Sequence, residues 1–142
     1  MVTKDEIIAF KEKFKIPPTE MSQVAKIFDE EKTISKVKKT IKILEDELKE
    51  FKGLKHVSDI RNKGLMAGID LKKDSNKNIA YELKERIGKK ICDLARKEGV
   101  LIRPLGDTIV IMPPISINQK ELKKLTKSIY KCIKIVTEDE TT

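Results

Sequence analysis

The sequence has no tryptophan, one histidine and two cysteines. Phenylalanine and tyrosine together make up 4% of its 142 residues. The cysteines, Cys92 and Cys132, lie far apart without the paired spacing of a zinc or redox site, and His56 is the only histidine that could join them. These counts argue against a disulfide-stabilised small fold and against a Cys/His metal site. We expect both cysteines to be core thiols.

Long hydrophobic runs are also missing. No apolar run approaches the ~20 residues needed to span a bilayer. The N-terminal sequence MVTKDEIIAF lacks the hydrophobic core of a signal peptide. We therefore expect a cytoplasmic protein with no membrane partner. Glutamine occurs only at Gln23 and Gln119, whereas lysine, glutamate and isoleucine are abundant. This bias is typical of proteins from heat-loving organisms, which favour surface ion pairs over amides.

Charge, by contrast, is plentiful. The chain has 31 Lys and Arg residues against 23 Asp and Glu residues, which gives a net charge of +8. Lysines that recur over residues 36–42 and 120–134 could contact phosphates without sequence specificity. However, acidic residues interleave on the other expected helices, and Phe28, Phe51 and Tyr130 occur at core spacing instead of forming a stacking surface. A basic nucleic-acid-binding module remains an alternative that the sequence disfavours.

The spacing of apolar residues predicts five helices. In the clearest one, the apolar residues from Ile34 to Phe51 step by three and four positions. Pro17-Pro18 separates the first two helices, and the spacing of Asn118 and Glu121 predicts a capping box at the start of the last. The expected helices span residues 5–14, 19–31, 34–51, 74–98 and 118–136. The inward side chains expected for the fourth are Ala80, Leu83, Ile87, Ile91 and Leu94.

Four shorter segments have the composition of strands. They form two pairs, and each pair is joined by a turn that contains glycine, which is typical of hairpins. The expected strands are residues 56–61 with 65–71 and residues 100–103 with 108–112. Together these elements predict an α+β fold, in which helices cover one face of a small sheet built from two hairpin-like strand pairs.

The residues alone indicate no catalytic machinery. No P-loop, nucleophile elbow or dinucleotide-binding glycine motif occurs. One segment differs from its surroundings: Arg103 closes an apolar strand and is followed by Pro104 and Gly106. This arrangement places a planar guanidinium, which can hold a carboxylate with two parallel hydrogen bonds, at a rigid loop. From the residues alone, a surface ion pair is the simpler interpretation of Arg103.

Two motifs carry a resemblance to a known family. Residues 103–114 follow the pattern RPxGxxIxxMPP, and residues 59–70 read DIRNKGLMAGID. Both resemble segments of the class III aminotransferases, pyridoxal-phosphate enzymes, and are most similar to those of biotin synthesis. The start of a long helix at residues 28–33 is similar too, and the resemblance covers residues 24–136. It implies a divergent N-terminal segment at 1–22, the family's C-terminal small domain at 23–137 and a frayed tail at 138–142.

The resemblance also implies roles for particular residues. By analogy with the family, Arg103 binds the substrate carboxylate near the cofactor. Gly64 is expected in a turn and Gly68 at a close packing contact, while Arg61 is expected to form a structural ion pair rather than to act in catalysis. Val110 replaces an aromatic residue that the biotin-synthesis enzymes often carry, which leaves the substrate open. The remaining motif residues with an expected structural role are Pro104, Gly106, Pro113 and Pro114.

The family's cofactor machinery has no counterpart in this sequence. The lysine that binds pyridoxal phosphate, its aspartate partner and the phosphate-binding region belong to a large domain that precedes the small one. We therefore expect an isolated domain, a fragment of the family's architecture, that binds no cofactor and is inactive alone. Its expected partner is a large aminotransferase domain or a second copy in a homodimer. A non-catalytic interaction or oligomerisation domain is a further alternative, because such a domain would expose apolar surface.

Overall fold

The computed structural model describes residues 25–26 and 28–138. The predicted helix at 5–14 and most of that at 19–31 lie outside these residues. The chain divides into a unit of residues 1–36 and a unit of residues 37–142. In the first unit, residues 25–26 and 28–30 are helical, and the N-terminal residues of helix α3 (Thr33–Glu50) follow. No helix within the described residues is long and apolar enough to cross a membrane.

Helix α3 confirms the strongest helical prediction. Leu44 and Leu48, one turn apart, are buried, whereas most of the lysines and acidic residues between them and on the other faces are exposed. The helix passes into a short 3-10 helix, η1 (Phe51–Gly53), where Phe51 is buried. The ring of Phe51 meets that of Tyr130 edge to face, with centroids 5.5 Å apart, a favoured aromatic geometry.

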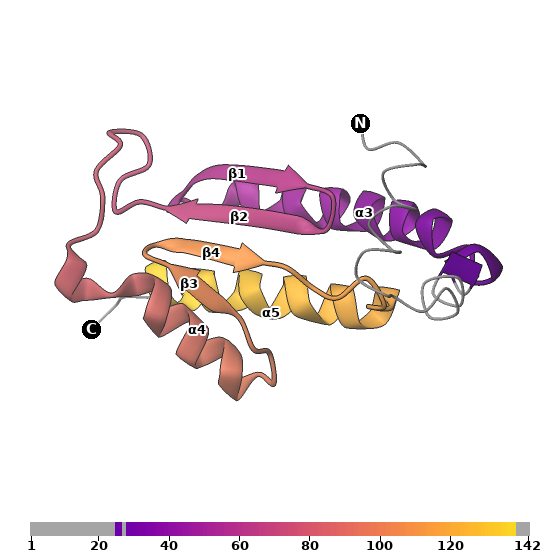
Figure 1. Cartoon of the computed structure of the whole chain (residues 1–142). Helices are drawn as coiled ribbons and strands as arrows, with labels where there is room; N and C mark the ends of the chain where they lie inside the picture. The colour runs from indigo at the N-terminus through magenta and orange to yellow at the C-terminus, as the bar shows by residue number, and fades with distance from the viewer. Residues whose placement is uncertain (1–24, 27, 139–142) are drawn as a thin grey trace, which may run out of the picture. The chain divides into compact units, whose positions relative to one another are not determined.

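The sheet has four antiparallel strands in the order β1-β2-β4-β3 (Figure 1). The strands are β1 (Val57–Lys63), β2 (Met66–Leu71), β3 (Arg103–Leu105) and β4 (Thr108–Ile111). Each predicted strand pair forms a hairpin, and the two hairpins join through β2 and β4 in the middle of the sheet. The α+β class and the two-hairpin sheet are therefore confirmed.

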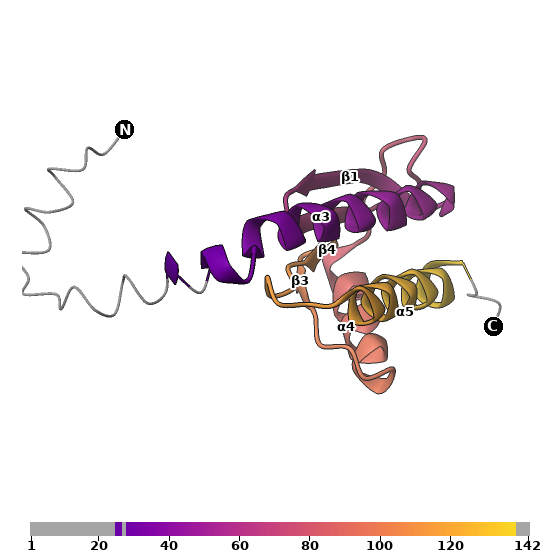
Figure 2. The ribbon, with the colours of Figure 1, turned by 90° about the vertical axis from the view of Figure 1, so that its right-hand side faces the viewer.

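One face of the sheet forms the core. Ile60, Ile69 and Ile109 pair across β1, β2 and β4, and Ala67 and Ile111 form the next buried pair. Alternate residues of an antiparallel sheet point to opposite faces, so these side chains share one face. Helices cover this face: in Figure 1, α3 lies behind β1 and β2, and α5 (Gln119–Thr137) lies behind β4, while Figure 2 shows the same layers from the side.

Helices α4 (Ile87–Lys97) and α5 complete the helical layer. The predicted capping box of α5 is present: Asn118 Oδ1 accepts from Glu121 N at 2.9 Å, and Glu121 Oε2 accepts from Asn118 N at 3.1 Å. The side chains of Cys92 on α4 and Cys132 on α5 are buried free thiols. Burial raises the pKa of both thiols, which keeps them protonated and unreactive near neutral pH.

The prediction of one long helix over 74–98 is wrong in its first half. Only α4, from Ile87 onward, is helical apart from the single 3-10 turn η2 (Leu83–Glu85). Asp74 does not start a helix: its Oδ1 accepts from Lys77 N at 3.0 Å and its backbone pairs with Ile79, which closes a turn. Aspartate competes for backbone donors in this way. Leu83 and Ala80, expected inside, are exposed, with Leu83 at 97%.

The predicted strand at 100–103 is also shifted. Strand β3 begins at Arg103, where that prediction ends. The reason lies at the end of α4, where Gly99 adopts a left-handed φ of +76° and Val100 N donates to Ala95 O at 2.9 Å. This helix ending uses the backbone of Val100 before the strand can start. Strand β4 ends at Ile111, one residue before the predicted end.

Candidate functional site

The face of the sheet opposite the core carries a cross-strand row with an arginine at each end. We call it the uncovered face, because no helix among residues 25–26 and 28–138 lies on it (Figures 1 and 2). Arg61 on β1 pairs with Gly68, Gly68 with Val110, and Val110 with Arg103 on β3. Residues that pair in register point to the same face. Arg61 and Arg103, the two arginines for which the sequence predicted a role, therefore lie on one surface, although they are 42 positions apart in the sequence.

Arg61 is paired with two carboxylates. Its Nη1 donates to Asp59 Oδ2 at 2.7 Å and its Nη2 donates to Asp70 Oδ1 at 2.7 Å, while Nη1 also contacts Asp70 Oδ2. Thr108 Oγ1 donates to the same Asp70 Oδ1 at 2.6 Å. The network spans β1, β2 and β4, and it joins the two hairpins on the uncovered face. It is the ion-pair arrangement expected of a structural arginine.

The ion pair between Arg61 and Asp70 shifts the pKa of both side chains. The hydrogen bonds from Arg61 are the main cause that lowers the pKa of Asp70, and the hydroxyl of Thr108 adds to it. The same contact with Asp70, followed by that with Asp59, raises the pKa of Arg61. A Cβ at Gly68 would lie 3.6 Å from Arg61 Nη2 and 3.4 Å from Thr108 Cγ2, which are ordinary van der Waals distances, so this network does not itself require a glycine there.

Arg103 has a different environment. It is the first residue of β3, it is exposed, and its side chain has no hydrogen-bond or ion-pair partner among residues 25–26 and 28–138. Pro104 follows directly, and Leu105 pairs with Thr108 to close a two-residue loop. Gly106, the first loop residue, has a φ of +61°, which glycine adopts without strain. The guanidinium of Arg103 is therefore held on a short hairpin and is free to bind an anion.

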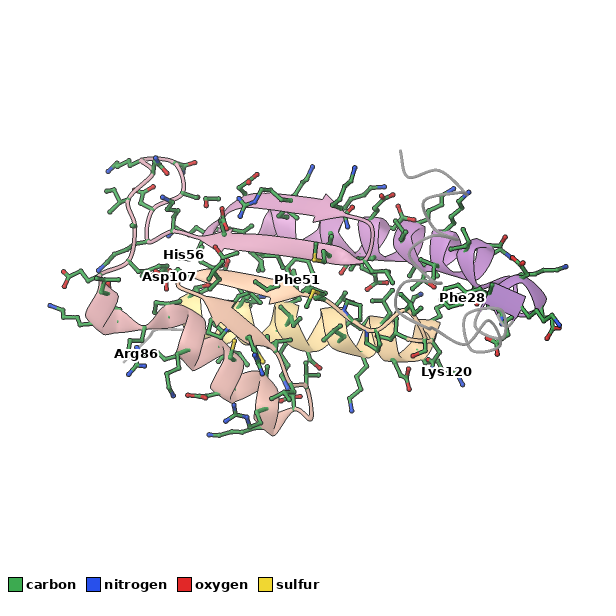
Figure 3. The ribbon with its side chains drawn as sticks, in the orientation of Figure 1. Phe28, Phe51, His56, Arg86, Asp107 and Lys120 are labelled. Atoms are coloured by element: carbon green, nitrogen blue, oxygen red, sulfur yellow. The ribbon has the colours of Figure 1, made fainter. Side chains whose placement is uncertain are left out.

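Helix α4 packs against the loop of this hairpin and holds it in place. Gly88 packs so closely on the loop that a Cβ there would lie 2.2 Å from the carbonyl oxygen of Gly106. Gly88 N donates to Asp107 Oδ1 at 3.3 Å, and Asp107 O accepts from Leu71 N at 3.1 Å. Figure 3 shows Asp107 at the end of the β4 hairpin, beside α4. Sequence analysis missed Gly88 and Asp107; a glycine at the start of a helix was the available signal for a close approach.

A groove of about 780 Å³ lies beside Arg103, between the segment that leads into β3, the segment after β4 and the first turns of α5. The motif prolines Pro113 and Pro114 line it, together with Arg103 and Pro104. Gly64 and Gly106 lie elsewhere, at the tips of the two hairpins, each with a positive φ. No cluster of three or more His, Cys, Asp or Glu side chains in the described part of the chain could hold a metal ion.

Comparison with known proteins gives the class to which this α+β fold belongs. Residues 20–133 match the family model of the class III aminotransferases. The chain therefore belongs to the class III aminotransferase family, whose members depend on pyridoxal phosphate.

Within the family, the chain is similar to enzymes that share one name. The adenosylmethionine-8-amino-7-oxononanoate aminotransferase of Aquifex aeolicus is 42% identical over 108 residues, which are 76% of this chain and 24% of the relative. The enzyme of the same name from Nitratidesulfovibrio vulgaris is 41% identical over 112 residues, 79% of this chain and 21% of the relative. The crystal structure of the Methanocaldococcus jannaschii enzyme of that name superposes with a TM-score of 0.74 at 34% identity, covering 78% of this chain and 25% of that one.

The chain thus spans about a quarter of the length of these relatives. The resemblance to the biotin-synthesis branch that the motifs predicted is confirmed at the level of family and relatives. The comparisons do not assign roles to single residues, so the function of Arg103 and the structural roles of the motif glycines and prolines stay predictions.

Proposed function

We propose that this chain is a small C-terminal domain of a class III transaminase, which contributes a substrate-carboxylate site and is inactive alone. The observation that carries the proposal is Arg103, a guanidinium without a partner among the described residues, on a hairpin fixed by α4. An arginine fork binds a carboxylate with two parallel hydrogen bonds. The relatives are named for 8-amino-7-oxononanoate, whose carboxylate is the group that Arg103 would orient.

The role of Arg103 is positioning. In the complete enzyme, pyridoxal phosphate supplies the electron sink for amino-group transfer. The contribution of this chain would be to hold one end of the substrate, so that its reacting end stays in a single orientation. Arg61 is less suited to this role, because its charge is already paired with the carboxylates of Asp59 and Asp70.

The described residues do not fit the cofactor itself. A lysine that binds pyridoxal phosphate works as an amine when burial or a nearby cation lowers its pKa. None of the lysines among residues 25–26 and 28–138 is buried, and the pKa shifts resolved for Lys49 and Lys131 are upward, caused by Asp46 and Glu98. We therefore assign cofactor binding to the family's large domain and not to this chain.

The surface around Arg103 supports a docked partner. Leu101, Leu105 and Met112 are large apolar side chains that are 79%, 74% and 68% exposed. Exposed apolar residues that gather in one place mark an interaction surface. The partner that fits the family is a large aminotransferase domain, and self-association into a homodimer is the alternative. Gel filtration with light scattering distinguishes them, because only self-association makes the apparent mass of the purified chain rise with concentration.

The alternative function, a basic nucleic-acid-binding module, has less support from the structure than the transaminase domain has. On α5, Lys123 lies 4.0 Å from Glu47, and Lys131 pairs with Glu98 at 2.9 Å. Part of the lysine face is thus neutralised within the fold, and we keep nucleic-acid binding only as a control. Binding to duplex DNA that falls steeply with salt would favour it.

The deciding experiment mixes the purified chain with the Methanocaldococcus jannaschii relative from which the segment that matches this chain has been removed. We expect no transaminase activity and no borohydride-trapped pyridoxal adduct with the chain alone, and activity in the mixture. Arg103→Gln should raise KM for the carboxylate substrate about tenfold to a hundredfold, and the exposed control Lys127→Gln should leave KM unchanged. A stoichiometric adduct on one lysine of the isolated chain would overturn the proposal.

A further inference from the structure

The start of helix α4 has no capping residue of its own. Arg86 occupies the N-cap position with a φ of 47°, and its side chain makes no capping hydrogen bond. A guanidinium carries only donors, so it cannot accept from the free N–H groups at a helix start. The first turn of α4 also contains no acidic residue, although negative charge is favoured at this end of a helix. The local sequence therefore supplies no acceptor for the N-terminus of α4.

The missing acceptor comes from the β3–β4 hairpin. Asp107 Oδ1 accepts from the N–H of Gly88, the second residue of α4, at 3.3 Å across 19 positions of the sequence. This N–H is one of those that a helix cannot pair internally, and the capping oxygen ordinarily comes from the residue just before the helix. Asp107 is half-buried, and its carbonyl oxygen accepts from Leu71 N at the end of β2 at 3.1 Å. Asp107 thus joins the hairpin loop to the helix and to the middle of the sheet.

The capped turn of α4 lies against the strand that carries Arg103. A Cβ at Gly88 would lie 3.0 Å from Pro104 Cβ and 2.2 Å from the carbonyl oxygen of Gly106, so the helix contacts both the strand and the loop. Pro104 directly follows Arg103. Strand β3 lies at the edge of the described sheet, and all three of its residues are exposed, so apolar burial contributes little to its position. The position of Arg103 therefore depends on the pairing of β3 with β4 and on the contact with α4.

From these contacts we propose that Asp107 is a positioning residue for Arg103, which acts by capping α4 from the hairpin. Asp107 does not touch the substrate. It holds the hairpin on the helix, so that the guanidinium of Arg103 meets a carboxylate in the one geometry that allows two parallel hydrogen bonds. This inference rests on the proposed function, in which Arg103 binds the substrate carboxylate. Neither the motifs nor the comparisons assign a role to Asp107.

The carboxylate at position 107 makes two contributions that substitutions can separate. Its oxygen accepts the hydrogen bond from Gly88 N, and its negative charge faces the positive end of the helix dipole. Asp107→Asn keeps an acceptor oxygen and loses the charge, whereas Asp107→Ala loses both. We therefore expect every effect to be larger in Asp107→Ala than in Asp107→Asn.

The first test uses the purified chain and needs no activity. Amide hydrogen exchange followed by NMR should be about fivefold faster at Gly88 in Asp107→Ala than in the parent protein, because a lost cap weakens the helix start. The backbone order parameter of Arg103 should fall in the same variant. Asp93→Ala is the matched control, since it removes a carboxylate that pairs with Lys89 on the same helix, and it should change neither quantity. Unchanged exchange at Gly88 and an unchanged order parameter at Arg103 would overturn the proposal.

The second test uses the mixture with the large domain of the relative. Asp107→Ala should raise KM for the carboxylate substrate about fivefold and leave kcat within about twofold, as expected when a binding group loses its position. In the Arg103→Gln background, Asp107→Ala should cause no further loss in kcat/KM, because residues that act through one another are not additive. An equal loss of kcat/KM in both backgrounds would mean that Asp107 acts independently of Arg103 and would reject the proposal.

The two tests separate this inference from the function on which it rests. If the mixture with the parent chain is inactive, the proposed function fails, and the NMR measurement still decides whether Asp107 holds the hairpin of Arg103. If the mixture is active and Arg103→Gln raises KM, but Asp107→Ala changes neither KM nor the exchange of Gly88, the role of Arg103 stands and that of Asp107 is rejected.

Discussion

Arg61 and Arg103 occupy the two ends of one cross-strand row, yet their surroundings differ. Arg61 meets two carboxylates on β1 and β2, whereas Arg103 meets none among the described residues. The pairing of Arg61 ties the hairpins together. The exposed fork of Arg103 contributes nothing visible to folding. The difference supports the proposed role of Arg103, because a side chain that is to bind a ligand needs no partner within its own domain.

The two hairpins are also held in different ways. The β1–β2 hairpin contributes Ile60, Ala67 and Ile69 to the core, so apolar burial anchors it. The β3–β4 hairpin buries Ile109 and Ile111, but the strand that carries Arg103 is exposed throughout, and its position depends on the close contact between Gly88 and Gly106. Substitutions in the two regions should therefore fail for different physical reasons.

The largest effect is expected in the core face of the sheet. Ile69 is completely buried, and Ile69→Ala would leave a cavity, so we expect a loss of about 4 kcal/mol in the free energy of unfolding. Val110, on the uncovered face of neighbouring β4, is the matched control: Val110→Ala should cost under about 1 kcal/mol. Urea denaturation followed by circular dichroism measures both. Equal losses would contradict the assignment of the two faces.

Next in size is the contact that holds the Arg103 hairpin. In Gly88→Ala the new methyl group would lie 2.2 Å from the carbonyl oxygen of Gly106, so helix and hairpin must move apart. We expect a loss of about 3 kcal/mol, with chemical-shift changes centred on residues 103–108. Gly53→Ala is the control, since a Cβ there meets nothing within 4 Å. A Gly88→Ala protein as stable as the control would show that the hairpin does not depend on this contact.

The same contrast explains what could be predicted from the sequence. Periodicity and capping residues predict α3, α5 and both hairpins because those elements obey local rules. The segment 74–86 obeys them too, yet it contains only the short 3-10 helix η2: Asp74 closes a turn, and Arg86 takes a left-handed φ of 47° directly before α4. Leu83 at a helical interval was misleading because a single apolar residue can be exposed at little cost.

The site was less predictable than the fold. The motif located Arg103 and Arg61, but only pairing between distant strands places them in one row. Asp59 and Arg61, two positions apart on an expected strand, were a readable sign of a same-face ion pair. The partners Asp70 and Thr108 depend on the register of β2 and β4, and the groove depends on how α5 packs. Such long-range relations are not encoded in local spacing.

A smaller effect separates the two arginines directly. Asp70 accepts hydrogen bonds from Arg61 and Thr108, so Asp70→Asn should lower the free energy of unfolding by about 1 kcal/mol. Arg103→Gln should leave stability unchanged, because no contact among the described residues is lost. Thermal unfolding of both variants beside the parent protein tests the comparison. A clear destabilisation by Arg103→Gln would mean that Arg103 has a structural role after all.

The smallest effect is the pH dependence that the Arg61–Asp70 pair creates. Because Arg61 holds the pKa of Asp70 below its ordinary value of 3.8, the unfolded chain binds this proton more readily than the folded chain does. The ionised carboxylate thus stabilises the fold above the unfolded pKa, and this contribution is lost as the pH falls through the folded-state pKa. Between pH 6 and pH 3, the parent protein should lose up to about 1 kcal/mol more than Asp70→Asn. Arg103→Gln should show the same pH dependence as the parent protein, since the side chain of Arg103 pairs with no carboxylate among the described residues. If the free energy of unfolding falls equally with pH in the parent and in Asp70→Asn, the Arg61–Asp70 pair does not stabilise the fold.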